Sequence, residues 1–319
     1  MGWWGGASAR RGLLGVWLAG CAAIAPVPVE TPGVDATAML ESVPATGVGE
    51  TVLLRFAWPE VLEGRCASRL ARVGTGGAAR SESTYGMRAE RDGDRIRIAT
   101  FDVQGGAASG PALPLDTALV VDVVDRSGRH LGFEGIDAAL EVVPEMQAAS
   151  APQRRALAEA LRERLARNWK LTVGAWVDRE LPLGATYAAS APENVEGGGS
   201  VRMRIAIRAD GRIPCQPGAA ERRCVRLHLR SQPDDERVEL LAPALLRELA
   251  PEQSIDPRAM VVQAVAAVTD VSLVTEPDTL VPYRFTMRRY LAIRGSTLDE
   301  PDFTRELREE ATRVCQWRR

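Results

Sequence analysis

Histidine and lysine are scarce in this chain, and their scarcity limits the chemistry that it can perform. The 319 residues include only two histidines, His130 and His228. Imidazole is a frequent metal ligand and general base in proteins, so most metal sites and many acid–base mechanisms lack their usual groups here. Lys170 is the only lysine, which leaves arginine to supply nearly all of the 40 basic residues.

An excess of charge of one sign is also missing. The formal net charge is -2 at pH 7, so no basic field indicates a nucleic-acid partner and no acidic excess indicates a cationic one. Hydrophobic residues make up 45% of the chain and charged residues 26%, which is typical of an ordinary globular protein and excludes a disordered chain.

The local signatures of common hydrolases are absent as well. The chain contains no Gly-x-Ser-x-Gly, Ser-x-x-Lys or His-Glu-x-x-His sequence. His130 follows a turn glycine, and we expect it to be a surface turn residue. The sequence therefore assigns no catalytic, cofactor-binding or metal-binding residue. An envelope hydrolase built from distant carboxylates stays open as an alternative, because sequence does not show how far apart two carboxylates lie across a cleft.

The N-terminus carries the strongest signal. Arg10 and Arg11 precede the apolar run from Gly12 to Ala19, whose eight residues are too few to cross a bilayer about 30 Å thick. The run ends in Leu18-Ala19-Gly20-Cys21, which resembles the lipobox of bacterial lipoproteins. In that pattern a thiolate accepts a diacylglyceryl group, and small side chains fit the peptidase that cuts just before the cysteine.

The lipobox resemblance implies a mature chain that begins at the lipidated Cys21. Two or more acyl chains anchor a protein stably, so the membrane is the first expected partner. In this family an aspartate after the cysteine favours inner-membrane retention, and Ala22 stands there instead. The expected location is the cell envelope, at the outer membrane facing the periplasm. The alternatives are a simple secretory signal cleaved near Ala23 or Ala25 and a twin-arginine signal.

Composition and periodicity divide the chain into five segments: a signal peptide over 1–20, a Pro-rich tether over 21–50, a first β-meander over 51–150, a helix over 151–170 and a second β-rich half over 171–319 that ends in a helix. The Asp92-Gly93-Asp94 turn marks a hairpin, and Leu157, Leu161 and Leu165 mark one face of the helix. Residues 51–319 forming a single domain is the alternative.

The predicted fold class is α+β, mainly antiparallel β, with one or more curved sheets packed on one or two helices. Residues 260–274 and 281–293 are expected to pair through the turn at Glu276, and Asp302 to Trp317 is expected to form the closing helix. Residues 51–293 resemble, in pattern alone, the uncharacterised β-rich domains of envelope lipoproteins. That resemblance implies no activity.

One predicted hairpin has an arginine-rich face. Apolar residues alternate with polar ones over 201–208 and 225–230. The polar side carries five arginines and a histidine: Arg202, Arg204, Arg208, Arg226, His228 and Arg230. This is typical of an antiparallel hairpin with one face on a core and one in water. The face either binds anionic headgroups or glycans, or is a solvated surface whose arginines pair with acidic neighbours; we favour the latter.

Four cysteines remain once Cys21 is set aside, an even number in an oxidising compartment. Cys215 and Cys224 flank the loop of the arginine-rich hairpin, so a disulfide there would staple it. Cys66 and Cys315 then pair by elimination. A reactive thiol or a metal-binding pair is the alternative, but no Cys-x-x-Cys is present.

These observations predict a membrane-anchored periplasmic lipoprotein that is not an enzyme and needs no cofactor. It would bind an apolar ligand, such as a lipid, or an envelope protein. Ligand binding predicts an apolar cavity. A structural or assembly lipoprotein without ligand predicts a filled core and docking through a sheet edge, and a hydrolase predicts converging carboxylates of perturbed pKa.

Overall fold

The structure is a computed structural model that describes residues 49–75, 77–107, 120–142, 147–195, 199–216, 221, 223–234, 237–249, 260–297, 300 and 302–318. The expected signal peptide, Cys21 and nearly all of the tether lie outside the described residues. Strands account for 62% of the described residues and helices for 18%, and the strands form a large, curved, open sheet. The prediction of a mainly antiparallel β fold is confirmed.

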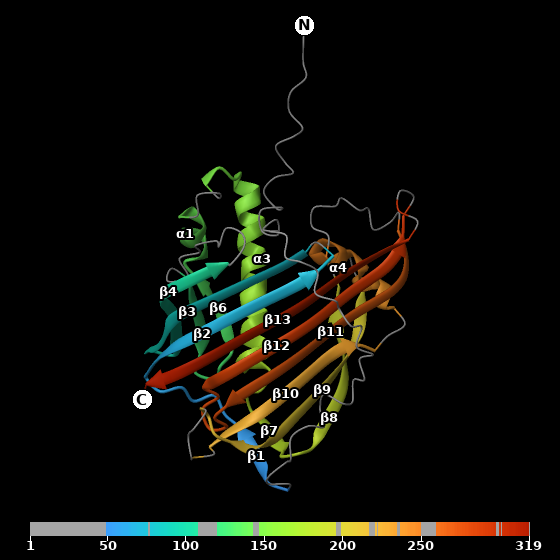
Figure 1. The fold of residues 1–319 in the computed structure, drawn as a ribbon. Coiled ribbons are helices and arrows are strands. Elements are labelled where there is room, and N and C mark those ends of the chain that lie inside the picture. The colour runs from blue at the N-terminus through green and yellow to red at the C-terminus, as the bar shows by residue number, and fades with distance from the viewer. Residues whose placement is uncertain are drawn as a thin grey trace.

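The main sheet has eleven strands in the order β6-β5-β4-β3-β2-β13-β12-β11-β10-β9-β8, and all neighbours are antiparallel (Figure 1). The first half of the chain gives β2 (Val61–Gly74), β3 (Gly77–Asp92), β4 (Arg95–Ala107), β5 (Val121–Asp125) and β6 (His130–Glu134). The second half gives β8 (Thr186–Asn194), β9 (Ser200–Ile213), β10 (Cys224–Pro233), β11 (Val261–Thr275), β12 (Pro282–Ser296) and β13 (Phe303–Arg318).

The last strand, β13, corrects the predicted C-terminal helix. It lies between β2 and β12, where it joins the strands of the first half to those of the second (Figure 1). Phe303, Leu307 and Ala311 recur at helical spacing, but Phe303, Leu307 and Cys315 also share one face of a strand. Two neighbouring strands supply hydrogen-bond partners for the whole segment, and this tertiary pairing overrides local helix propensity.

The other elements lie at the ends and on one side of the main sheet. They are α1 (Ile136–Glu141), α3 (Ala151–Trp169), the π-helical turn η3 (Lys170–Gly174), the short 3-10 helix η4 (Val238–Leu241) and α4 (Ala242–Leu249). A separate two-stranded sheet pairs β1 (Thr51–Leu54) with β7 (Arg179–Pro182). The predicted span of α3 is confirmed, and the Ser150 N–H donates a 2.8 Å hydrogen bond to Gln153 Oε1 at its start.

The main core fills one end of the curve. Leu227, Leu273, Phe285 and Cys315 belong to it together with Trp176, which is fully buried. We call the face of the sheet that carries these residues the inner face and the opposite one the outer face. Figure 1 shows α3 on the inner side of the curve.

The aromatic ring of Trp169, at the end of α3, ties this core together. Its Nε1–H donates a 3.0 Å hydrogen bond to the carbonyl of Gly128. Its ring meets Phe56 and Trp58 edge-on, with centroids 6.0 and 5.9 Å away. Edge-to-face packing and a satisfied indole N–H make the burial of Trp169 stable, and the ring helps to fill the core at this end of the curved sheet.

Both predicted disulfides are present. Cys215–Cys224 closes the loop before β10, and Cys66–Cys315 joins β2 to β13 across a sequence separation of 249. Because β13 is a strand, the second disulfide links two strands of one sheet and not a helix to a sheet.

Candidate functional site

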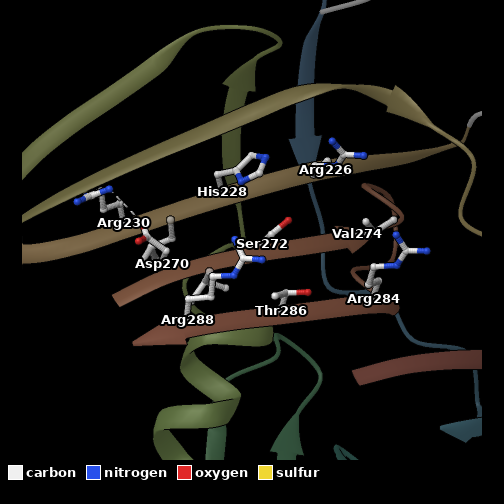
Figure 2. A pocket seen from close by; sticks show the side chains of 11 residues that line it. Arg226, His228, Arg230, Asp270, Ser272, Val274, Arg284, Thr286 and Arg288 are labelled. Atoms are coloured by element: carbon white, nitrogen blue, oxygen red, sulfur yellow. Dashed lines mark ion pairs between the residues drawn. The ribbon is translucent and has the colours of Figure 1, made fainter. Parts of the chain in front are cut away.

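The outer face carries a polar pocket over β10, β11 and β12, with a volume of about 300 Å³ (Figure 2). Its polar lining comes from alternate positions of these strands: Arg226, His228, Arg230, Asp270, Ser272, Arg284, Thr286 and Arg288. Alternate residues of a strand point to the same face, so the side chains of three neighbouring strands meet here.

The strand register arranges nine of these outer-face positions as a grid of three rows. Val274 lies between Arg226 and Arg284, Ser272 between His228 and Thr286, and Asp270 between Arg230 and Arg288. Arginines therefore stand at all four corners, and the small Ser272 stands at the centre (Figure 2). We refer to these nine residues as the arginine grid. Its small centre and long corners explain why the surface is hollow here.

Asp210 supports the grid from β9. The register of β9 against β10 shifts between Val225 and Leu227, which forms a bulge at Asp210-Gly211. The buried Asp210 carboxylate lies 2.9 Å from His228 Nε2, 3.0 Å from Arg208 Nε and 3.9 Å from Arg226. Burial opposes its ionisation, but the hydrogen bond with His228 and the neighbouring cations outweigh burial and lower its pKa.

Asp270 is the one carboxylate inside the grid. Its Oδ1 lies 3.6 Å from the Arg230 guanidinium. Burial raises the pKa of Asp270, although the charges of Arg230, Arg288 and His228 act in the opposite direction. The pKa of Asp210 is thus lowered and that of Asp270 is raised, and the two carboxylates lie on opposite sides of His228. Guanidinium groups make up most of the surface between them.

Two corners of the grid are exposed to solvent. Arg288 is 3.7 Å from Glu310 and more than half exposed. Arg284 is exposed and forms no ion pair with any other part of the chain that the structure describes. The grid therefore offers guanidinium groups to solvent beside those that Asp210 and Asp270 already engage.

The predicted hairpin of β9 and β10 is confirmed, and its arginines divide between the two interpretations. Arg208, Arg226 and Arg230 pair with acidic neighbours, as favoured. Arg202 and Arg204 are exposed on β9 and do not line the pocket. Sequence reasoning missed the contribution of β11 and β12. The alternations Asp-x-Ser-x-Val and Arg-x-Thr-x-Arg in 270–274 and 284–288 were the signal for it.

The inner face has a second, apolar region. Tyr85, Ile205, Ile207 and Met287 pack against the main core but keep part of their surface exposed. Apart from Trp169, the side chains of α3 that pack tightly face α1 and β6, where Leu161 joins a separate cluster. The inner face thus carries partly exposed apolar side chains among the described residues, and Arg313 of the central strand β13 lies among them, between Phe285 and Ser68.

Charged residues border this apolar region. Arg289, Glu309 and Arg72 lie side by side on β12, β13 and β2, and Arg72 Nε is 2.9 Å from Glu309 Oε2. Glu248 of α4 pairs with Arg289. On the other side of the curve Asp122 faces inward from β5; burial raises its pKa to about 7, partly offset by the charge of Arg313.

Cys215, Cys224 and Glu276 are close enough to suggest a metal site, since one ligand atom from each lies within 4.8 Å of the others. Both sulfurs are joined in the disulfide and offer no thiolate. The Tyr283 hydroxyl donates a 2.8 Å hydrogen bond to Glu276, and Arg223 lies 3.3 Å away. This cluster fixes the turn between β11 and β12.

His130 is not the surface residue that we expected. Its ring stacks 4.4 Å from that of Phe133, and its Nε2 is buried with no hydrogen-bond partner among the described residues. Burial lowers its pKa, against a backbone hydrogen bond with Gly132. The turn glycine Gly128 packs against the Phe56 ring, so the turn before His130 lies against the core.

Comparisons with known proteins add little. No family model matches the chain, and neither does any curated protein. Lipovitellin, in a structure titled for its lipid–protein interactions, aligns with 82% of this chain at 8% identity and a TM-score of 0.41. The chain spans only 26% of the length of that lipovitellin chain. Neisserial surface protein A aligns over 80% of this chain and 97% of its own, at 7% identity and a TM-score of 0.15. Similarity at this level carries no functional information.

Within the described residues no helix combines the length and the apolar character that crossing a membrane requires.

Proposed function

We propose that this protein is a lipid-anchored envelope lipoprotein, attached to the outer membrane through Cys21 and facing the periplasm, that binds an apolar chain on its inner face. The observation that carries the proposal is the partly exposed apolar surface of that face, to which Tyr85, Ile205 and Met287 contribute where they pack against the main core. In this proposal the helices α3 and α4 complete the walls around the ligand.

The physical argument rests on incomplete burial. An apolar side chain that stays in contact with water forgoes about 25 cal/mol for each Å² left exposed. A ligand with an aliphatic chain would cover this surface and recover that free energy. Arg289 and Arg313, which flank the Met287–Ala311 pair on the inner face, would hold the polar end of such a ligand beside these apolar side chains.

The first test is native mass spectrometry of the full chain carrying Cys21→Ser, which removes the proposed anchor, purified from a periplasm before and after solvent extraction. A bound mass of lipid size that disappears on extraction is the expected result. A single apo mass in both samples contradicts ligand binding.

A pair of variants locates the ligand. Ala311 lies on the inner face between Met287 and Leu70, whereas Val314 of the same strand is exposed on the outer face. Ala311→Trp would place an indole ring on the apolar surface that the ligand chain would otherwise cover. We therefore expect it to reduce bound lipid at least about tenfold. Val314→Trp adds the same bulk outside and should retain the lipid. Equal retention in both variants would place the ligand elsewhere.

A sheet edge favours a second function, assembly with another envelope protein. β8 pairs with β9 on one side and with no described strand on the other, and its nine residues are largely exposed. A free edge can accept a strand from a partner. A photo-crosslinker in place of the exposed Tyr187 should then capture one envelope protein in cells, and the same probe at Val314 should not.

A further inference from the structure

We infer that the arginine grid on the outer face is a binding site for a phosphate group, independent of the apolar ligand on the inner face. The two sites lie on opposite faces of the sheet, so either can exist without the other. The chemistry fits the headgroup of an anionic phospholipid and a soluble phosphate compound alike.

Charge gives the first reason. The grid holds four guanidinium groups and one carboxylate, Asp270, which Arg230 engages, and Glu310 of β13 lies 3.7 Å from Arg288. Arg226 lies 3.9 Å from Asp210, a carboxylate that also contacts Arg208 and His228. An anion between the corners would remove the remaining repulsion. On a whole chain with a formal charge of -2, this concentration of positive charge is local.

Shape gives the second reason. Neighbouring strands are about 4.8 Å apart and alternate residues on a strand about 7 Å apart, so the four corners form a rectangle of about 10 Å by 14 Å at the backbone. Arginine side chains are long enough to reach inward from these corners to one phosphate over the centre. The floor of that space is Ser272, flanked by Thr286 and His228. Figure 2 shows the arginine side chains standing around these shorter ones.

Hydrogen bonding gives the third reason. Guanidinium groups present planar pairs of N–H donors that match phosphate oxygens, and the hydroxyls of Ser272 and Thr286 add donors that carry no charge. A carboxylate ligand could satisfy two of these groups, whereas the tetrahedral oxygens of phosphate reach several corners together. The site therefore favours phosphate over smaller planar anions.

The test uses the full chain carrying Cys21→Ser, so that the proposed anchor plays no part. Calorimetric titration with inorganic phosphate is compared with flotation on vesicles of phosphatidylcholine alone and with added phosphatidylglycerol. Binding of either phosphate source supports the site. Binding of phosphate alone identifies a soluble ligand, and binding of the anionic vesicles alone identifies a headgroup. Failure to bind both overturns the inference.

Two variants separate a built site from general surface charge. Arg284→Gln removes the corner without an ion pair, and we expect a loss of affinity of at least about tenfold, as for one charge-assisted hydrogen bond. Ser272→Leu keeps every charge and fills the centre, and it should weaken binding as much. The matched control is Arg294→Gln, because Arg294 is exposed on the outer face of the same strand but lies outside the grid. An equal loss in Arg294→Gln, or none in Ser272→Leu, would show that only net charge matters.

Discussion

Asp122 is held on the inner face of β5 in surroundings that oppose its ionisation. Burial raises its pKa from 3.8 to about 7, despite the charge of Arg313. Between these two values the folded state binds more protons than the unfolded state, so the free energy of unfolding falls as pH rises from about 4 to about 7. Asp122→Asn removes this dependence, since the amide never ionises.

We therefore expect Asp122→Asn to match the wild type near pH 4 and to be more stable at pH 8. A shift of about three pKa units corresponds to about 4 kcal/mol at most, and residual solvent contact should reduce the gain to about 1–2 kcal/mol. Urea unfolding at both pH values measures it. Asp94→Asn is the control, because that carboxylate is 90% exposed. Parallel pH profiles for wild type and Asp122→Asn would contradict the assigned environment.

At the scale of residues, sequence alone found three of the nine residues of the arginine grid. The alternation of Arg226, His228 and Arg230 identified one row of side chains correctly. The contribution of Arg284 and Arg288 on β12 could not be predicted in this way, because it depends on which strand lies two places away from β10 in the sheet. That neighbour is set by the turn at Glu276 and by the strand register, and local sequence fixes register only weakly.

At the scale of elements, the strands with clean alternation and the helix α3 were predictable, but β13 was not. Its sequence satisfies a helical and a strand pattern alike, and its two partners, β2 and β12, come from opposite ends of the folded part. The pairing of Cys66 with Cys315 was predicted correctly by elimination, once Cys215 and Cys224 had been paired across the hairpin loop. The disulfide requires residue 315 to lie beside β2, and a strand that pairs with β2 meets this requirement directly.

The two disulfides should differ in their effect on stability because they close loops of different length. Cys66–Cys315 spans 249 residues and Cys215–Cys224 spans 9. In the chain-entropy model, the disulfide that closes the longer loop stabilises the folded state by about 5 kcal/mol, and the one that closes the shorter loop by about 2.5 kcal/mol. Guanidinium unfolding of the two double-serine variants, both carrying Cys21→Ser, should show the larger loss for Cys66→Ser/Cys315→Ser. A smaller loss there would mean that β13 holds its place by strand pairing alone.

At the scale of the whole molecule, the sheet presents two unlike faces. The inner face offers apolar surface to a ligand, and the outer face offers arginines around Ser272. An anchor at Cys21 and a phosphate site on the outer face would act on the same membrane. Their contributions can be separated, because one is a covalent acyl group and the other depends on salt.

If the proposed lipidation of Cys21 is correct, we expect the wild-type chain to fractionate with the outer membrane and to resist extraction by salt, since two or more acyl chains would hold it. Cys21→Ser should move it to the soluble periplasmic fraction at high salt, and mass spectrometry of the wild-type N-terminus should find the acyl groups on Cys21. A secretory signal cleaved near Ala23 or Ala25 removes Cys21, so unchanged fractionation and an unmodified N-terminus would contradict the anchor. If the Cys21→Ser variant binds membranes at low salt but not at high salt, the additional substitution Ser272→Leu should release the protein from them. Retention of that double variant would mean that the headgroup is bound outside the arginine grid.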